Sequence, residues 1–97
     1  WQGIGRTKDI LNIKLLKKKW ASFGWNSIEI DGHNYKQIEN IFKKKRNGKP
    51  TAVIAKTIKG KGISFMEDDN NWHYRIPNIE ELDKIKILYI LFINKKM

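Results

Sequence analysis

The sequence predicts an α/β fold that contains part of a parallel β-sheet. Residues 25–31 alternate between apolar and polar side chains, residues 35–46 repeat apolar side chains at helical spacing, and residues 51–55 run as Thr-Ala-Val-Ile-Ala without alternation. An uninterrupted run suits a strand that is covered on both faces, and a strand, a helix and a strand in this order form a βαβ unit. Because two strands do not make a stable sheet, we expect other strands to complete it.

The composition limits the chain to one small domain with a strongly basic surface. It has 97 residues and a net charge of +10, from 20 Lys and Arg against 10 Asp and Glu. Such a charge attracts polyanions: nucleic acid, acidic membranes or phosphorylated small molecules. Only Arg6, Arg46 and Arg75 are arginines, and base-reading proteins depend on arginine. A lysine-rich solvated surface is therefore the simpler interpretation.

Cysteine is absent from the sequence, which excludes disulfides and thiolate metal sites and fits a reducing compartment. The chain opens on Trp1, without a methionine, a basic start or an apolar segment, so no signal peptide is visible. We therefore expect a cytoplasmic protein, and a sequence from the interior of a longer reading frame.

The first predicted helix has apolar side chains three and four residues apart, at Ile13, Leu16, Trp20 and Phe23. Asn12 or Asp9 is suited to cap its start, and Gly24 is suited to end it. The lysines within residues 14–19 lie mostly off the apolar face, so we interpret them as a solvated helix surface. Residues 1–9 are predicted to form a loop.

The strand at 25–31 ends in the turn Asp31-Gly32-His33-Asn34, where we expect His33 to have a structural hydrogen-bonding role. Asn34 and Gln37 form a capping-box pattern for the next helix. The inner face of this helix is predicted to carry Tyr35, Ile38, Ile41 and Phe42. Its last turn is predicted to hold four cations that suit the negative end of a helix dipole, Lys43, Lys44, Lys45 and Arg46.

The segment after the second strand, 56–73, is predicted to be a long loop that carries the residues with chemical potential. Its Gly60-Lys61-Gly62 motif could approach a phosphate, although it lacks the spacing of a phosphate-binding loop and the helix that follows one. The acidic residues 67–69 could attract a cation, but adjacent carboxylates in a polar turn are more often solvated. His73, beside Trp72, is the better candidate for a donor to an oxyanion or phosphate.

A last helix is predicted to begin at the capping box of Asn78 and Glu81 and to continue through Leu82 and Ile85. Residues 87–93 are apolar all round the helix, but spanning a bilayer needs about 20 residues. This run is either a buried helix end or sequence that did not evolve with this fold.

Five short segments of the chain occur in the order and spacing of a known enzyme family. They are residues 19–25 (KWASFGW), 28–34 (IEIDGHN), 49–51 (KPT) and 55–67 (AKTIKGKGISFME), and the pair Trp72-His73. Across residues 1–82 the chain resembles transketolase and, more narrowly, the N-terminal subunit of split bacterial transketolases. Several motifs in register are more specific than any one of them.

The resemblance implies a partial parallel sheet of flavodoxin-like topology, from a thiamine diphosphate-binding domain. It implies the transfer of a two-carbon ketol unit between sugar phosphates, as in the pentose phosphate pathway, with thiamine diphosphate and Mg²⁺ (or Ca²⁺) as cofactors. The implied protein partners are a homodimer partner and a C-terminal transketolase subunit, with no membrane and no nucleic acid.

The resemblance also assigns roles to individual residues. His73 matches the histidine that contacts the diphosphate side of the cofactor and the donor sugar, and Gly60 lies in the same cofactor-binding loop. Trp1 falls near the position whose backbone carbonyl binds the metal. The Gly-Asp-Gly motif and later Asn that hold the metal and diphosphate in the family are absent here, so both cofactors would need residues from elsewhere. The family usually has glycine after the loop histidine, where this chain has Tyr74.

The resemblance divides the chain into the C-terminal half of a diphosphate-binding domain, residues 1–85, and a divergent apolar and basic tail, residues 86–97. We therefore expect a fragment of a transketolase that is not active alone. Two other interpretations stay open. The net charge and the basic run near residue 45, with Trp and Tyr available to stack, suit a small nucleic-acid-binding module. The third interpretation is a functionless fragment that aggregates through exposed sheet edges.

Overall fold

The computed structural model describes residues 1–45 and 47–97, and these form two compact units, Trp1–Ile58 and Lys59–Met97. We call them the N-terminal unit and the C-terminal unit and describe each by itself. Arg46, predicted at the end of the second helix, lies outside the described residues.

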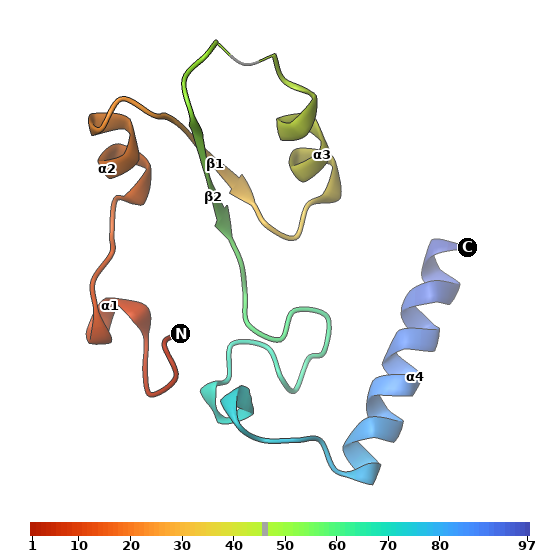
Figure 1. Ribbon diagram of the computed structural model, residues 1–97. Helices are drawn as coiled ribbons and strands as arrows, with labels where there is room; N and C mark the ends of the chain where they lie inside the picture. The colour runs from red at the N-terminus through yellow and green to blue at the C-terminus, as the bar shows by residue number, and fades with distance from the viewer. Residues whose placement is uncertain (46) are drawn as a thin grey trace. The chain divides into compact units, whose positions relative to one another are not determined.

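The N-terminal unit is built on two parallel strands, β1 (Asn26–Asp31) and β2 (Thr51–Lys56). They pair in continuous register from Asn26 opposite Thr51 to Asp31 opposite Lys56. Helix α3 (Tyr35–Lys43) makes the connection between them, as Figure 1 shows. The predicted βαβ unit and the partial α/β fold are therefore confirmed.

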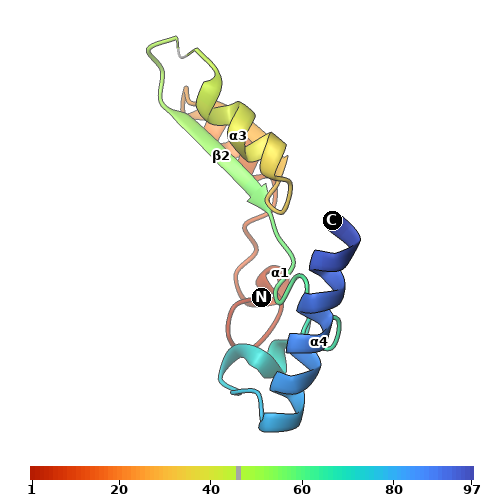
Figure 2. The same cartoon turned by 90° about the vertical axis from the view of Figure 1, so that its right-hand side faces the viewer.

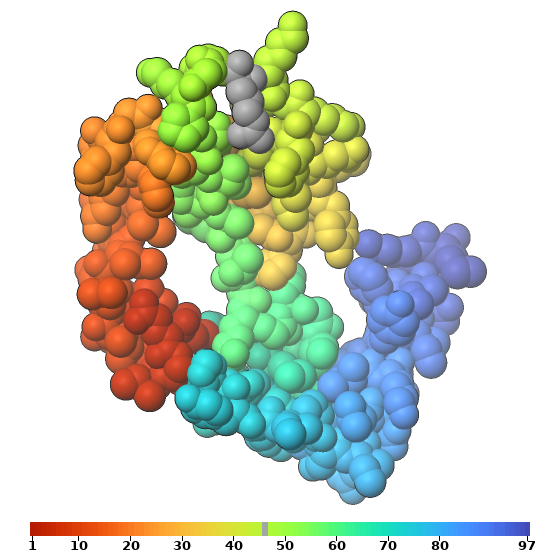
Figure 3. All heavy atoms as spheres, in the orientation of Figure 1, coloured from red at the N-terminus to blue at the C-terminus, as the bar shows by residue number. Residues whose placement is uncertain are grey.

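Helices cover both faces of this small sheet. Helix α2 (Leu16–Ser22) and helix α3 lie on opposite sides of the strands in Figures 1 and 2. In the space-filling view of Figure 3, the atoms of β2 (green) lie between those of α2 (orange) and α3 (yellow to yellow-green). Val53 of β2 is nevertheless 40% exposed, so within the described residues the continuous sequence of this strand is only partly covered.

The start of the chain differs from the prediction in two places. Residues Thr7–Ile10 form a single helical turn, α1, where a loop was predicted. Helix α2 begins at Leu16, after Leu15 adopts the left-handed conformation (φ 61°), and no side chain caps it. The predicted caps are therefore wrong, because Asn12 instead accepts a hydrogen bond from the Lys14 amide before the helix begins. Gly24 follows the end of the helix, as predicted.

Helix α3 has the predicted cap but only half of the predicted inner face. The side chain of Asn34 accepts a hydrogen bond from the Gln37 amide at 3.1 Å. The Gln37 side chain reaches past the cap to accept from the Asp31 amide, so the capping box is not closed. Ile41 is 8% exposed, whereas Tyr35 and Phe42 are 80% and 74% exposed, because β1 packs against only one side of the helix.

The C-terminal unit contains a loop, the short 3₁₀ helix η1 (Asn70–His73) and helix α4 (Ile79–Lys96). Asn78 caps α4 as predicted, accepting from the Glu81 amide at 2.8 Å. The helix continues without a break past residue 85, so the tail predicted from residue 86 is helical; the division there stays a prediction. Most side chains of the 87–93 run are exposed, and no helix within residues 1–45 and 47–97 is long and apolar enough to cross a membrane.

Candidate functional site

The loop that carries Gly60 and His73 is folded by hydrogen bonds within itself. The Asp68 amide donates to the Lys59 carbonyl at 2.8 Å, which closes the loop across its base. Inside this closure, the Ile63 amide donates to the Gly60 carbonyl and the Met66 amide donates to the Ile63 carbonyl, at 3.2 and 2.8 Å. The loop is therefore a compact structure rather than an open strand of chain.

Gly60 is required by this closure. Its backbone has φ 74°, a region that favours glycine, and a Cβ at this position would lie 2.4 Å from the Met66 carbonyl oxygen. The close approach of the two backbone segments leaves no room for a side chain. Gly60 thus determines the path of the loop, and the contact with a phosphate inferred from its sequence stays a prediction.

The carboxylates of Glu67 and Asp69 have structural roles in the loop. A carboxylate oxygen of Glu67 accepts from the Gly62 amide at 3.0 Å, and a carboxylate oxygen of Asp69 accepts from the Asn71 amide at 2.9 Å. The second bond caps η1 at its N-terminus. These two carboxylates therefore organise the backbone that leads to His73.

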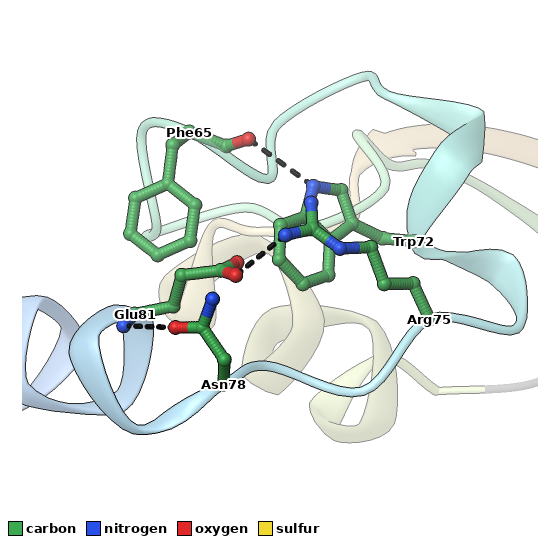
Figure 4. Close-up of polar contacts among 5 residues, drawn as sticks. All are labelled: Phe65, Trp72, Arg75, Asn78 and Glu81. Atoms are coloured by element: carbon green, nitrogen blue, oxygen red, sulfur yellow. Dashed lines mark hydrogen bonds and ion pairs between the residues drawn. The ribbon is translucent and has the colours of Figure 1, made fainter.

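Trp72 fixes the end of the loop (Figure 4). Its indole N–H donates to the Phe65 carbonyl at 3.2 Å, and the two rings contact at a centroid distance of 5.7 Å. The Arg75 guanidinium lies over the face of the indole, 4.2 Å from the ring centroid, and pairs with the Glu81 carboxylate. This stack joins the loop to the first turn of α4. Sequence reasoning missed Arg75, although a cation three residues after a tryptophan was a usable signal.

His73 is the last residue of η1, next to the anchored Trp72, and its side chain is exposed. Its imidazole lies against the Tyr74 ring at a centroid distance of 4.4 Å, edge to face. Tyr74 has φ −115° and ψ −16°, an ordinary conformation for a residue with a side chain. The turn after His73 therefore accommodates Tyr74, and what the tyrosine adds is a ring that contacts the imidazole.

His33 has the structural hydrogen-bonding role that the sequence predicted. Its Nε2 atom accepts a hydrogen bond from the Ile58 amide at 2.8 Å. One residue earlier, the Gly32 amide donates to the Lys56 carbonyl at 2.7 Å. The turn after β1 is thus joined to the end of β2 by two hydrogen bonds.

An exposed ion pair lies on the sheet, between Lys56 of β2 and Glu29 of β1 at 2.7 Å. The hydrogen bond from Lys56 holds the pKa of the Glu29 carboxyl below its ordinary value, and the charges of Lys56 and Lys17 act in the same direction. Desolvation opposes this shift without reversing it. Because both side chains are solvated, the pair is a minor source of stability.

The described residues do not form a metal site by themselves. Within residues 1–45 and 47–97, no three His, Cys, Asp or Glu side chains come together as a group that could hold a metal ion. Trp1 belongs to the N-terminal unit, where the Arg6 guanidinium lies over its ring at 3.9 Å, and Gly60 and His73 belong to the C-terminal unit. The role of the Trp1 carbonyl as a metal ligand stays a prediction.

Comparison with known proteins identifies sequences that are similar to this chain. The chain is 41% identical over 83 residues, 84% of its length, to a subunit of apulose-4-phosphate transketolase from Actinobacillus succinogenes. It is 32% identical over 82 residues to the subunit of the same name from Phocaeicola vulgatus, and 41% identical over 59 residues to human transketolase. No family model matches the chain.

The match covers only part of each relative. The chain spans 30% of the A. succinogenes protein and 29% of the P. vulgatus protein, and the human match covers 9% of that enzyme. Similarity across most of this chain to both split and single-chain enzymes agrees with the segments that suggested the family. The chain is thus a homologue of transketolases, similar over most of its length to part of the subunits that carry this name.

Proposed function

We propose that the chain supplies one wall of a thiamine diphosphate site in a transketolase, which transfers a two-carbon ketol unit between sugar phosphates. The similarity to the split-enzyme relatives supports this proposal. The observation that carries it is the loop from Gly60 to His73, which folds on its own hydrogen bonds and leaves the His73 imidazole exposed next to an anchored tryptophan. Thiamine diphosphate would supply the carbanion chemistry when bound.

His73 is the side chain that we propose works directly on the ligand. An imidazole can donate a hydrogen bond to a phosphate oxygen or to an oxyanion. Its position at the end of η1 is set by the Asp69 cap and the Trp72 indole bond. Gly60 contributes through the backbone, by allowing the loop to close.

The remainder of the site would come from residues outside this sequence. Both sheet edges are open among the described residues, because each of the two strands pairs only with the other. In the described part of the chain, Ile41 is the only buried hydrophobic side chain. We propose that these additional residues add strands to the sheet and cover the exposed Tyr35 and Phe42 rings. They would also bring the groups that hold Mg²⁺ (or Ca²⁺) and the diphosphate. A chain that lacks these groups would not be active alone.

Two of the relatives are named as subunits, which supports a partner polypeptide in addition to the remaining residues of this domain. We therefore propose that the working assembly contains two copies of the complete diphosphate-binding subunit together with the C-terminal transketolase subunit. Such an assembly would act in the cytoplasm on sugar phosphates of the pentose phosphate pathway type.

A chimera tests the proposal. This chain replaces the 83 aligned residues of the A. succinogenes relative, and ketol transfer is measured with the partner polypeptide of that enzyme, thiamine diphosphate and Mg²⁺. We expect activity in the chimera and a roughly 100-fold lower kcat/KM after His73→Ala, which removes the imidazole donor. Asn71→Ala, an exposed position in the same helical turn, is the matched control and should change little. Equal activity of the His73→Ala chimera would contradict the role of His73.

The nucleic-acid-binding interpretation is not favoured by the relatives, which are named as transketolases or transketolase-like proteins. A basic surface binds polyanions through counterion release, so its affinity falls steeply with salt. We expect only weak, fully salt-sensitive binding of this chain to single-stranded DNA. Specific binding that persists at physiological salt would revive this alternative.

A further inference from the structure

The parallel ladder between β1 and β2 continues for one bond beyond the last paired residues. Asp31 and Lys56 are the final pair, and the next bond runs from the Gly32 amide to the Lys56 carbonyl at 2.7 Å. In a parallel ladder, the following bond would run from the amide of Ile58 to the carbonyl of Gly32. That bond is replaced by one to a side chain.

The Ile58 amide instead donates to Nε2 of His33 at 2.8 Å. The β1 backbone has already turned away at this point, because the Asp31 carboxylate accepts from the His33 amide at 2.9 Å and the Asp31 carbonyl accepts from the Asn34 amide at 3.1 Å. An imidazole nitrogen therefore takes the place that a ladder carbonyl would have had.

Close packing at Gly32 allows this substitution. A Cβ on Gly32 would lie 2.6 Å from Cγ2 of Thr57 and 2.9 Å from the Lys56 carbonyl oxygen. Only a residue without a side chain lets the turn lie this close to the exit of β2. The same closeness brings the imidazole within reach of Ile58.

The hydrogen bond requires one protonation state of the imidazole. A nitrogen that accepts from an amide carries no proton, so this bond requires the tautomer of His33 that has its proton on Nδ1. A lysine or arginine side chain could not replace the imidazole here, because it carries only hydrogen-bond donors.

We propose that His33 is a positioning residue for the cofactor loop. Its imidazole holds Ile58, which is the last residue of the N-terminal unit and lies two residues before Gly60. The side-chain bond thereby extends the fixed part of β2 to the residue from which the loop begins. This inference rests on the proposed function only for its effect on cofactor binding; the hydrogen bond is tested without it.

The first experiment measures amide hydrogen exchange at Ile58 in the full chain. We expect His33→Leu, which keeps the bulk but removes the acceptor, to speed exchange at Ile58 by roughly tenfold, the size expected for one lost hydrogen bond. His33→Gln returns an acceptor at similar reach and should restore much of the protection. The Gly32 amide, bonded to Lys56, is the internal control and should stay protected in both variants.

Nitrogen NMR of the imidazole tests the same bond in the unchanged chain, so the test does not depend on whether a variant folds. We expect the signal of an unprotonated Nε2 and a scalar coupling between it and the Ile58 amide. A proton on Nε2, or unchanged exchange at Ile58 in His33→Leu, would overturn the proposal.

The second experiment measures thiamine diphosphate affinity in the chimera with the A. succinogenes relative. If the bond to Ile58 positions the loop, we expect a roughly tenfold higher Kd after His33→Leu and partial recovery with His33→Gln. Equal affinity in all three forms would contradict the positioning role while leaving the hydrogen bond in place. Failure of the unsubstituted chimera to bind would instead count against the proposed function, and the exchange experiment would then decide on His33 alone.

Discussion

The two units of this chain are held together by different kinds of interaction. The N-terminal unit depends on a backbone ladder with helices on both faces, and its buried contribution within the described residues comes from Ile41. The C-terminal unit depends on a left-handed glycine, side chains bonded to backbone amides, and the stack of Phe65, Trp72 and Arg75. The first is a piece of a sheet that more strands can extend, whereas the second contains a loop that closes on its own hydrogen bonds.

This difference predicts where each unit is vulnerable. A unit held by pairing and packing should lose stability when packing is removed, and it should gain stability when new strands are added. A unit held by local hydrogen bonds should be sensitive to backbone geometry and indifferent to the missing strands.

The largest effect is expected from Gly60→Ala. The new Cβ would collide with the Met66 carbonyl and the residue would be held at φ 74°, so the loop should lose about 2–4 kcal/mol. Hydrogen exchange at the Asp68 and Met66 amides would measure the loss. Gly62→Ala is the matched control, because Gly62 also has a positive φ (100°) but a Cβ there would have no atom within 4 Å. This substitution should cost only about 1 kcal/mol. Equal costs for the two variants would show that the contact with Met66 does not limit the loop.

A smaller effect is expected from Ile41→Ala in the other unit. Removing the buried side chain should cost about 2 kcal/mol, since the helix can only partly close the space. Exchange at the β1 and β2 amides should rise, while exchange at Met66 should not change. The neighbouring Phe42→Ala removes a 74% exposed ring and should have little effect. Loss of protection in both units would mean that they are not separate in stability.

The smallest effect concerns Glu29. Because Lys56 lowers its pKa in the folded chain, its contribution to stability is present above its unfolded pKa and is lost as the pH falls through the folded value, below about 4.5. A carboxyl titration by NMR should show the pKa rising after Lys56→Met. Lys17→Met should raise it less, because Lys17 acts only through its charge. A larger rise with Lys17→Met would show that Lys17, and not Lys56, causes most of the shift.

Several patterns that depend on neighbours in sequence were predicted correctly. The parallel strands, the cap at Asn34 and the cap at Asn78 follow from alternation, apolar runs and side chains three residues apart. The hydrogen-bonding role of His33 followed from its place in a turn, but its partner, 25 residues later, did not. The start of α2 was missed because Leu15 takes a left-handed conformation that its sequence does not favour.

The failures share a cause. Tyr35 and Phe42 were assigned to the inner face of α3 by their spacing, yet spacing identifies a face without saying what covers it. The stack on Trp72 was missed because it joins residues from a loop, a 3₁₀ helix and the segment before α4. Among the predicted site residues, Gly60 and His73 lie in one self-folded loop, and the sequence alone did not show that the loop closes at Lys59 and Asp68.

The central claim, that this chain carries only part of a cofactor site, is tested most directly by calorimetry. Thiamine diphosphate with Mg²⁺ is titrated into the chain alone, into the A. succinogenes relative from which the aligned 83 residues have been removed, and into an equimolar mixture of the two. The account predicts no binding by either polypeptide alone and saturable binding by the mixture, abolished or weakened by His73→Ala. Binding of the cofactor by the 97-residue chain alone, followed by ketol transfer, would contradict it.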